Sequence, residues 1–284
     1  PSSTSIAVIG AGPAGLMAAE TLAAAGFAVD VYDAMPSVGR KFLLAGVGGM
    51  NITHSEQTTD FISRYREASP WVGEWLAPFG ANELREWIHG LGIETFIGSS
   101  GRVFPSDMKA APLLRAWLRR LREQGVSLHN RHRWRGWDAQ RHCLFDTPQG
   151  PVNKAHCAVI LALGGGSWAR LGSDGAWVSL LQEQGVQVRD LLPANGGFTR
   201  EWSQHLSQGF AGRPLKQVIA SVTLANGTQE AKRGECILTH DGLEGSLIYA
   251  LSAPLRDQLL QTGRARLTLD LAPDRTEDQL QAIL

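Results

Sequence analysis

The first 33 residues follow a hydrophobic pattern typical of a strand, a turn, a helix and a second strand. The run at 5–10, SIAVIG, is short and β-branched, which predicts a buried strand. The alanine-rich stretch that follows predicts a helix, with Pro13 in its first turn and Gly26 at its end. The run at 27–33, FAVDVYD, predicts the second strand. The chain therefore opens as an α/β fold.

The pattern beyond residue 33 is mixed. Residues 33–56 are rich in glycine and lack periodicity, so we expect a long ordered loop, a kind of segment that is often functional. Helical patterns occupy parts of 60–91 and the stretch from about Ser106 to Gly125. Three strand-like runs follow and end with VILALGGG; this last run is continuously apolar, which predicts a central strand buried on both faces.

Another helical pattern precedes a change of texture near residue 190. Strand-like segments dominate afterwards, and the ANG sequence after SVTL indicates a hairpin. We therefore expect a first domain over 1–190, with its helical segment at about 60–91, and a β-rich second domain over 191–272. Residues 273–284 look like the start of a helical segment, with Thr276 as its N-cap.

Composition narrows the function classes. The 284 residues are 43% hydrophobic and 19% charged, with 27 basic and 27 acidic side chains, so no net charge steers the chain onto nucleic acid or anionic lipid. Three scattered cysteines and the absence of a CxxC pair argue against a zinc or dithiol site and suit a cytoplasmic protein. The apolar runs are too short to span a bilayer. We expect a small-molecule substrate and no metal; the oligomeric state stays open.

The three glycines of IGAGPAG carry the first chemical signal. Gly10 permits a tight turn, Gly12 lets the backbone approach a pyrophosphate, and Gly15 lets the helix pack closely on the sheet. The N–H groups at the helix start favour an anion. Asp33 ends the second strand, where a carboxylate accepts hydrogen bonds from adenosine ribose hydroxyls and repels the 2′-phosphate of NADP.

Other features favour FAD over NAD. A glycine-rich loop follows Asp33 where an NAD-binding half would return to a helix and a strand, and it could run along a larger cofactor. The strand ending in LALGGG offers a second backbone contact at the carboxyl edge of the sheet. The segment GRVFPS at 101–106 could place a wall beside a ring system. An NAD-dependent dehydrogenase and a non-catalytic flavin-binding redox sensor stay open as alternatives.

Five segments together resemble a known family, the bacterial BaiN-like or aminoacetone-oxidase-like flavoproteins. They are IAVIGAGPAGLMAA, VYDAMPSVGRKFLLAGVGGMNITHS, GRVFPSDMKAAPLLRAWLRRL, VILALGGGSWARLGSDGAW and GECILTHDGLEGSLIYALS. The resemblance implies a Rossmann-like FAD-binding domain of glutathione-reductase type with an inserted, β-barrel-like second domain. It also implies a helical insert and a C-terminal return to the FAD domain, which the 284 residues do not contain. The implied activity is FAD-dependent oxidation or reduction of a small organic substrate.

The resemblance also implies site residues. The predicted cofactor-binding set is Gly10, Gly12, Pro13, Ala14, Gly15, Asp33, Ala34, Arg40, Lys41, Met50, Asn51, Ile52, Ala162, Leu163, Gly164 and Gly165. Three departures from the family pattern stand out: Gly49 and Met50 replace an Arg and a Cys, Leu163 replaces a Thr, and LTHDGLEGS replaces an FTHYGISGP-type segment. The first departure weakens the expectation of a thiol near the flavin. The last means that the family's substrate-binding residues are not carried over to this chain.

The catalytic prediction is less specific. His240 is the best candidate by residue type, because histidine exchanges protons near neutral pH, although the sequence slightly favours the alternative, a turn histidine with a satisfied hydrogen bond. A covalent flavin link at His54 has no further support in the sequence. NAD(P)H could act as a transient reductant, yet no second complete GxGxxG is present. The arginines at 119–135 are expected on the polar side of a helix and on one face of a strand, with Arg131, Arg133 and Arg135 alternating.

Overall fold

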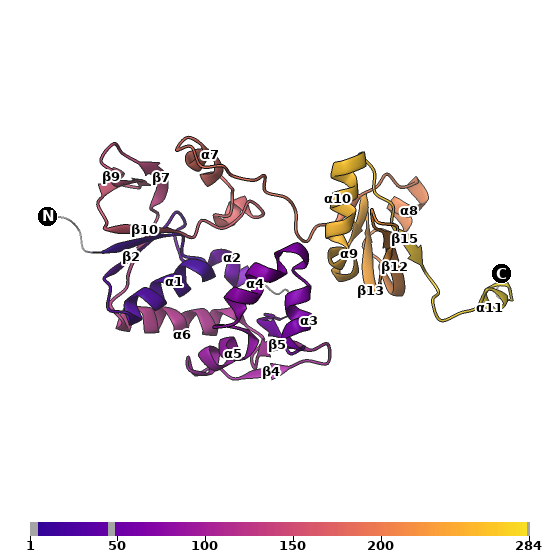
Figure 1. Ribbon diagram of the computed structural model, residues 1–284. Coiled ribbons are helices and arrows are strands. Elements are labelled where there is room, and N and C mark those ends of the chain that lie inside the picture. Colours follow the sequence, from indigo (N-terminus) through magenta and orange to yellow (C-terminus); the bar gives the residue numbers. More distant parts are fainter. Residues whose placement is uncertain (1–4, 45–48, 283–284) are drawn as a thin grey trace. The chain divides into compact units, whose positions relative to one another are not determined.

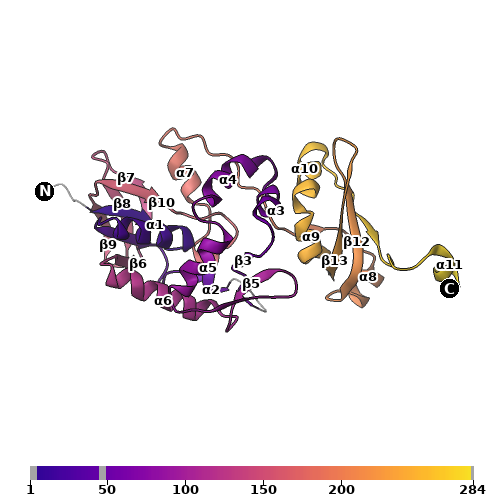
Figure 2. The ribbon, with the colours of Figure 1, turned by 60° about the horizontal axis from the view of Figure 1, so that its bottom comes forward.

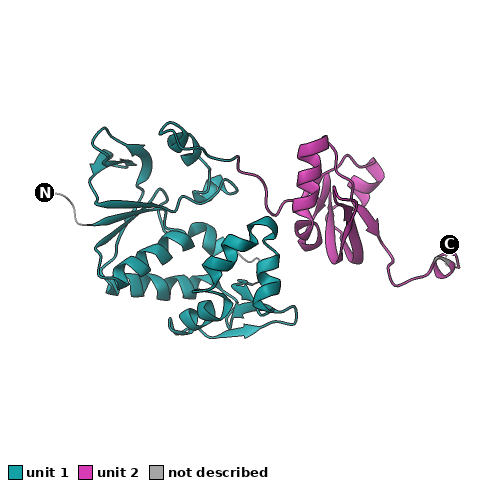
Figure 3. Cartoon of the chain, viewed as in Figure 1, with its two compact units in different colours: residues 1–189 teal, residues 190–284 magenta. Residues whose placement is uncertain are grey.

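The computed structural model describes residues 5–44 and 49–282. The chain forms two compact units, residues 1–189 and 190–284, shown in different colours in Figure 3. The expected division after residue 190 lies one residue away from this one, and residues 273–284 group with the second unit. Each unit has its own sheet and its own core, so the two are described separately.

The first unit is built on a parallel sheet of four strands in the order β10-β1-β2-β6. The strands are β1 (Ile6–Ile9), β2 (Val29–Asp33), β6 (Ser127–Asn130) and β10 (Ala158–Leu161). All four residues of β1 are buried, because β1 lies inside the sheet and both of its faces are covered. The predicted strand–helix–strand start is confirmed.

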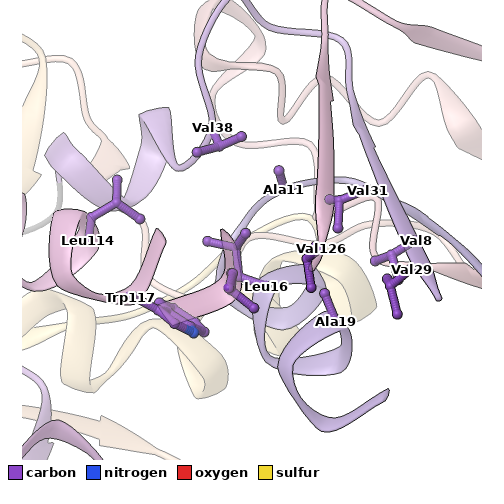
Figure 4. Close-up of a cluster of buried hydrophobic side chains, with 11 residues drawn as sticks. Val8, Ala11, Leu16, Ala19, Val29, Val31, Val38, Leu114, Trp117 and Val126 are labelled. Carbon is purple, nitrogen blue, oxygen red and sulfur yellow. The ribbon is translucent and has the colours of Figure 1, made fainter. Parts of the chain in front are cut away.

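Different layers cover the two faces of this sheet (Figure 1). The helices α1 (Pro13–Ala24) and α6 (Ala110–Glu123) pack on one face, and the other face carries an antiparallel meander of β7 (Arg133–Trp137), β8 (Cys143–Thr147) and β9 (Gly150–Lys154). Figure 4 shows the helix-side core, in which Val8 and Val31 meet Leu16, Ala19 and side chains of α6. Side chains alternate along a strand, so Ala7 and Ile9 face the meander instead.

Two expectations about the strands were wrong. The strand β10 is at the edge of the sheet in the described part of the chain, and its residues are half-buried or exposed, so its apolar run does not mark a central strand. The first strand-like run splits at Arg131, which has φ +56°, into β6 of the parallel sheet and β7 of the meander. Of the three arginines, only Arg133 and Arg135 therefore share a strand. Arg131 lies in the turn between β6 and β7.

Two expectations about helices also need correction. The helix α6 begins at Ala110 rather than near Ser106, because Met108 adopts φ +61° and the Asp107 carboxylate accepts a hydrogen bond from the Lys109 N–H, which forms a turn before the helix. The expected loop at 33–56 contains the short helix α2 (Arg40–Leu44) and the strand β3 (Thr53–His54). Residues 45–48 of this loop lie outside the described residues.

A small antiparallel sheet and a group of helices complete the first unit. The sheet contains β3, β5 (Arg102–Pro105) and β4 (Thr95–Ile97), in that order. The helices are α3 (Thr58–Ser63), η1 (Arg66–Ala68), α4 (Ser69–Leu76), α5 (Ala81–His89), η2 (Ala169–Leu171) and α7 (Trp177–Gln182). Figures 1 and 2 show α5 beside this sheet, in agreement with the α5 contacts to β3 and β4. The helix α4, which carries Trp71 and Trp75, lies within the expected helical segment at about 60–91.

A buried carboxylate joins three helices of this unit. Glu20 on α1 is only 9% exposed, and it accepts hydrogen bonds from the indole N–H groups of Trp87 and Trp117 and from the Arg120 guanidinium. The Trp117 bond is 2.6 Å long, and the Arg120 ion pair is 3.0 Å. A buried charge is tolerated only when it is paired in this way, so the cluster ties α5 and α6 to α1.

The second unit is an antiparallel sheet of five strands in the order β11-β14-β13-β12-β15, covered by helices. The strands are β11 (Phe198–Thr199), β12 (Pro214–Thr223), β13 (Gln229–Thr239), β14 (Gly242–Glu244) and β15 (Thr268–Asp270). The helices are α8 (Gln204–Gly209), α9 (Ser246–Ala250), α10 (Ser252–Thr262) and α11 (Glu277–Gln281). The predicted hairpin at 224–228 and the N-cap at Thr276 are both confirmed.

Helices α9 and α10 supply the core of the second unit. Leu247, Ile248, Leu251 and Leu255 pack against apolar residues of β12 and against Cys236 of β13. The β-rich second unit agrees with the expected fold class. Among the described residues of both units, no helix is long and apolar enough to cross a membrane.

Candidate functional site

A cavity of about 410 Å³ lies at the carboxyl ends of β1 and β10, beside the N-terminus of α1. Ligands of open parallel sheets bind at this edge. The lining residues come from four segments of the chain: Gly10, Ala11, Gly12 and Pro13; Asp33, Met35, Gly39, Arg40, Lys41 and Phe42; Ala162, Leu163 and Gly164; Leu171, Gly172 and Ser173. The glycine motif thus opens into a real cavity.

The three motif glycines have three different surroundings. A Cβ on Gly10, which has φ +106°, would lie 2.2 Å from the Ala162 carbonyl oxygen, and a Cβ on Gly15 would lie 1.8 Å from the Gly10 carbonyl oxygen. Both positions are therefore closed by packing between the turn, α1 and the end of β10. A Cβ on Gly12 would meet no atom within 4 Å. Gly12 is the glycine that leaves room for a ligand.

The N-terminus of α1 is open towards this cavity. Gly12 is the N-cap, so no side chain caps the helix, and Pro13 occupies the first helical position. The first N–H groups of a helix have no partner inside the helix, and the helix dipole makes this end positive. An anionic group can bind here without displacing a capping side chain.

Asp33 is tied into the protein backbone as well as lining the cavity. One carboxylate oxygen accepts a hydrogen bond from the Ala11 N–H and the other from the Met35 N–H, each at 2.8 Å. Burial raises the pKa of the Asp33 carboxyl above its ordinary value, and the two hydrogen bonds oppose that shift. Each oxygen keeps a second lone pair, so Asp33 can still accept a hydroxyl donor.

The two basic residues of the loop both line the cavity. Lys41 donates a hydrogen bond of 2.8 Å to the Ser167 hydroxyl. The Nε of Arg40 is buried and has no hydrogen-bond partner in the described residues, and its Nη1 reaches the Ser37 hydroxyl at 3.5 Å. No described carboxylate lies within ion-pair distance of Arg40 or Lys41. Within the described residues, the charges of Arg40 and Lys41 on the cavity wall are therefore not paired with a carboxylate.

The structure distributes the other predicted cofactor residues over different places. Ala162, Leu163 and Gly164 line the cavity with the glycine motif, whereas Ala14, Gly15 and Gly165 do not. Ala34 lines an adjoining cavity of about 310 Å³, which shares Gly10, Asp33, Leu163 and Gly172 with the first one. The second cavity lies against the meander and α7, so the cleft continues past Asp33 in that direction.

Met50, Asn51 and Ile52 line a separate cavity of about 330 Å³ between α1, α5 and α6. Its lining is almost wholly apolar and includes Trp87 and Trp117. The cavity shares Pro13 and Phe42 with the cavity of the glycine motif, so the two adjoin. The Asn51 side chain is turned to the backbone, where its amide donates to the Thr53 carbonyl oxygen at 2.7 Å.

The two histidines considered for catalysis have ordinary environments. His240 lies in the second unit, exposed in the turn between β13 and β14, and lines none of the cavities of the described first unit. Its catalytic role therefore stays a prediction. In the first unit, His54 contacts the Ser100 carbonyl oxygen through Nε2 and the Glu56 N–H through Nδ1. Both ring nitrogens of His54 are engaged in holding the loop.

Another cavity, of about 610 Å³, lies in the second unit. Apolar side chains of the unit's core line it, among them Phe198, Ile248 and Leu267. It carries neither a glycine turn nor an open helix N-terminus. The smaller cavity at the glycine motif is therefore the better candidate site.

Sequence reasoning missed several lining residues, of which Met35, Gly172 and Ser173 are the most informative. Gly172 has φ +89°, and a Cβ there would lie 2.8 Å from the Met35 side chain, so the segment after η2 folds back onto the loop that follows Asp33. The sequence LGSDG carries a turn signal, but nothing in it indicates which wall of which cavity the turn forms.

Comparison with protein families and known proteins also indicates a Rossmann domain. Residues 4–248 match the family described as HI0933-like protein Rossmann domain. A 3-dehydro-bile acid delta(4,6)-reductase from Clostridium scindens is 24% identical over 278 residues, which are 97% of this chain and 66% of that protein. This chain therefore spans about two thirds of the length of that relative.

Two solved structures share the fold. FrdA of the E. coli quinol fumarate reductase matches 98% of this chain and 55% of its own, with a TM-score of 0.53 and 14% identity. The 3-ketosteroid-delta4-(5alpha)-dehydrogenase of Rhodococcus jostii RHA1 matches 66% of this chain and 55% of its own, with a TM-score of 0.51 and 14% identity. At this identity they bear on the fold alone, and the expected fold class is confirmed.

Proposed function

Because the chain belongs to the HI0933-like family with a Rossmann domain, as the sequence predicts, we propose that it is part of an FAD-dependent oxidoreductase that transfers hydride to or from a small organic substrate. The cofactor is FAD, and the first unit contributes the walls that hold it. The named relative, a reductase, supports redox chemistry on an organic molecule.

The observation that carries this proposal is that one cavity contains both free space at Gly12 and a buried Arg40 guanidinium nitrogen without a described partner. Gly12 leaves more than 4 Å free where a side chain would stand, and the buried Arg40 Nε in the same cavity has no hydrogen-bond partner among the described residues. A buried donor without a partner is costly and is satisfied when a ligand supplies an acceptor. The residues present thus fit an anionic diphosphate.

The roles of the chain's own residues follow from the cavity wall. The backbone at Gly10–Gly12 and the start of α1 would bind the diphosphate, and Arg40 and Lys41 would neutralise part of its charge. Asp33 would accept a ribose hydroxyl with its remaining lone pairs. Ala162, Leu163 and Gly164 would form the opposite wall.

The adjoining apolar cavity suits a flat ring system. Met50, Asn51 and Ile52 line it, and its wall of Trp87 and other apolar side chains would exclude water from the reacting atoms. FAD, when bound, supplies the chemistry of accepting and giving up hydride. We keep His240 as the proposed proton-exchanging residue, to be tested by His240→Ala, with unchanged turnover arguing against it.

The experiment begins with the 284-residue chain and FAD. We expect a yellow complex with a shifted flavin spectrum, and anaerobic bleaching when NADH, NADPH or a suitable reduced organic substrate is added. A chain that binds NADH tightly but never FAD would support the NAD-dependent dehydrogenase instead. A yellow protein that no donor bleaches would favour a non-catalytic redox sensor.

A further inference from the structure

Ser173 is a buried serine whose hydroxyl has no partner in the described residues. The residue is only 6% exposed, and its Oγ is wholly buried. Serine hydroxyls inside proteins nearly always donate or accept a hydrogen bond, because burial otherwise strips them of water without compensation. No described residue supplies that partner, so a bound ligand or a water molecule is left to do so.

The position of Ser173 indicates where that partner lies. Ser173 lines the same cavity as Gly12 and Arg40, and its Oγ is 3.6 Å from the place where a Cβ of Gly164 would stand. The neighbouring Gly172 packs on Met35, two residues after Asp33. Ser173 therefore lies between Gly164 and the segment that follows β2.

The backbone holds Ser173 firmly in this place. Its N–H donates to the Trp168 carbonyl oxygen at 3.1 Å, and its carbonyl oxygen accepts from the Trp168 N–H at 3.0 Å. The next residue, Asp174, forms an ion pair of 3.0 Å with Arg133 of β7. A side chain on a segment fixed at both ends cannot easily turn to find another acceptor, so its hydroxyl is pre-organised for a ligand.

We propose that the Ser173 hydroxyl donates a hydrogen bond to an oxygen of the ADP portion of the bound dinucleotide, and that Ser173 is a positioning residue for the cofactor. The inference rests on the proposed function, since it needs a dinucleotide in this cavity. Together with the Arg40 Nε, it gives the cavity two buried donors that no described residue satisfies and that a ligand in the cavity would.

This role predicts two effects of opposite sign for Ser173→Ala. The apo protein should melt at the same or a higher temperature, because the substitution removes a buried polar group that has no partner. The affinity for the ligand should fall about tenfold to a hundredfold, as expected for loss of a hydrogen bond to a charged oxygen. A serine with a structural role would instead lower the melting temperature of the apo protein.

Ser252 provides the matched control. It is 0% exposed, its hydroxyl accepts a hydrogen bond from the Gly196 N–H, and the Tyr249 carbonyl oxygen at 2.9 Å is the nearest acceptor for its single proton. Ser252→Ala should lower the melting temperature and leave the ligand affinity unchanged. Ser173→Cys retains the size of the side chain with a poor donor, so it should behave like Ser173→Ala.

The test is calorimetric titration of the 284-residue chain and its variants with ADP and, separately, with FAD, alongside melting curves of the apo proteins. We expect the same loss for both probes, because they share the ADP portion. Equal affinities of the original chain and Ser173→Ala overturn the role of Ser173 and leave the proposed function standing. A loss confined to FAD overturns the placement at ADP. If the original chain binds neither probe, the proposed function fails as well.

Discussion

Among the motif substitutions, Gly12→Ala best distinguishes an effect on ligand binding from an effect on the stability of the fold. The added Cβ meets no atom within 4 Å, and the residue has φ −81°, which alanine adopts readily. Alanine is a poorer N-cap than glycine, but it also restricts the unfolded chain, and these effects oppose each other. We expect the stability of the apo protein to change by at most about 1 kcal/mol, or about 4 °C in melting temperature.

The same methyl group would occupy space that the proposed diphosphate needs. Overpacking by one methyl group typically costs about 1–3 kcal/mol, which corresponds to a loss of affinity of about 5-fold to 150-fold. Calorimetric titration with ADP and FAD measures this loss directly. The expected result is therefore a protein of nearly unchanged stability with clearly weakened binding.

Gly209→Ala is the control for the glycine substitution itself. Gly209 ends α8 in the second unit, and a Cβ there also meets no atom within 4 Å. It should leave both the affinity and the melting temperature near those of the original chain. If Gly12→Ala bound ADP as tightly as the control does, the ligand would not approach Gly12 and the proposed orientation of the site would be refuted.

Three further changes test other parts of the structure. Asp33→Asn points an amide N–H at one of two backbone N–H groups, so both the melting temperature and the ADP affinity should fall, as measured by melting curves and calorimetry. Glu20→Ala leaves Arg120 and two indole N–H groups without their acceptor, and urea unfolding should show a loss of about 3–5 kcal/mol; an unchanged midpoint would contradict the buried cluster. Burial lowers the pKa of His156, so the unfolded chain takes up its proton first; stability should fall as the pH drops from about 6.5 towards the folded pKa, and His156→Gln should flatten that slope in urea titrations.

The elements that the sequence predicted well are specified by neighbouring residues. Pro13 and Gly26 mark the two ends of α1, and the β-branched and aromatic residues of FAVDVYD fit the strand β2. The capping box at Thr276 and the hairpin at 224–228 are likewise local. In each case the residues that determine the conformation lie within a few positions of one another, so the printed sequence suffices.

The predictions that were wrong depend on contacts between distant segments. Whether β10 is central or at an edge depends on strand order, which the apolar run at 156–161 does not contain. The start of α6 depends on the left-handed conformation of Met108, and the neighbouring residues give no sign of that conformation. The buried cluster at Glu20 was not predicted at all, because the partners of Glu20 are 67, 97 and 100 positions away.

The environment of Asp33 changes what an acid at this position implies. Its spacing from the glycines predicts a ribose acceptor, yet both of its oxygens already hold backbone N–H groups that fix the Ala11 turn and the start of the following loop. An acid here therefore also stabilises the backbone that forms the cavity wall, with or without a ribose. The position of Asp33 alone is therefore weaker evidence for one dinucleotide over another than the sequence suggests. Residues outside the glycine motif must account for the choice of cofactor. Arg40 and Ser173 would bind the ADP portion that all these dinucleotides share, so the choice between them would depend on the adjoining apolar cavity at Met50 and Ile52.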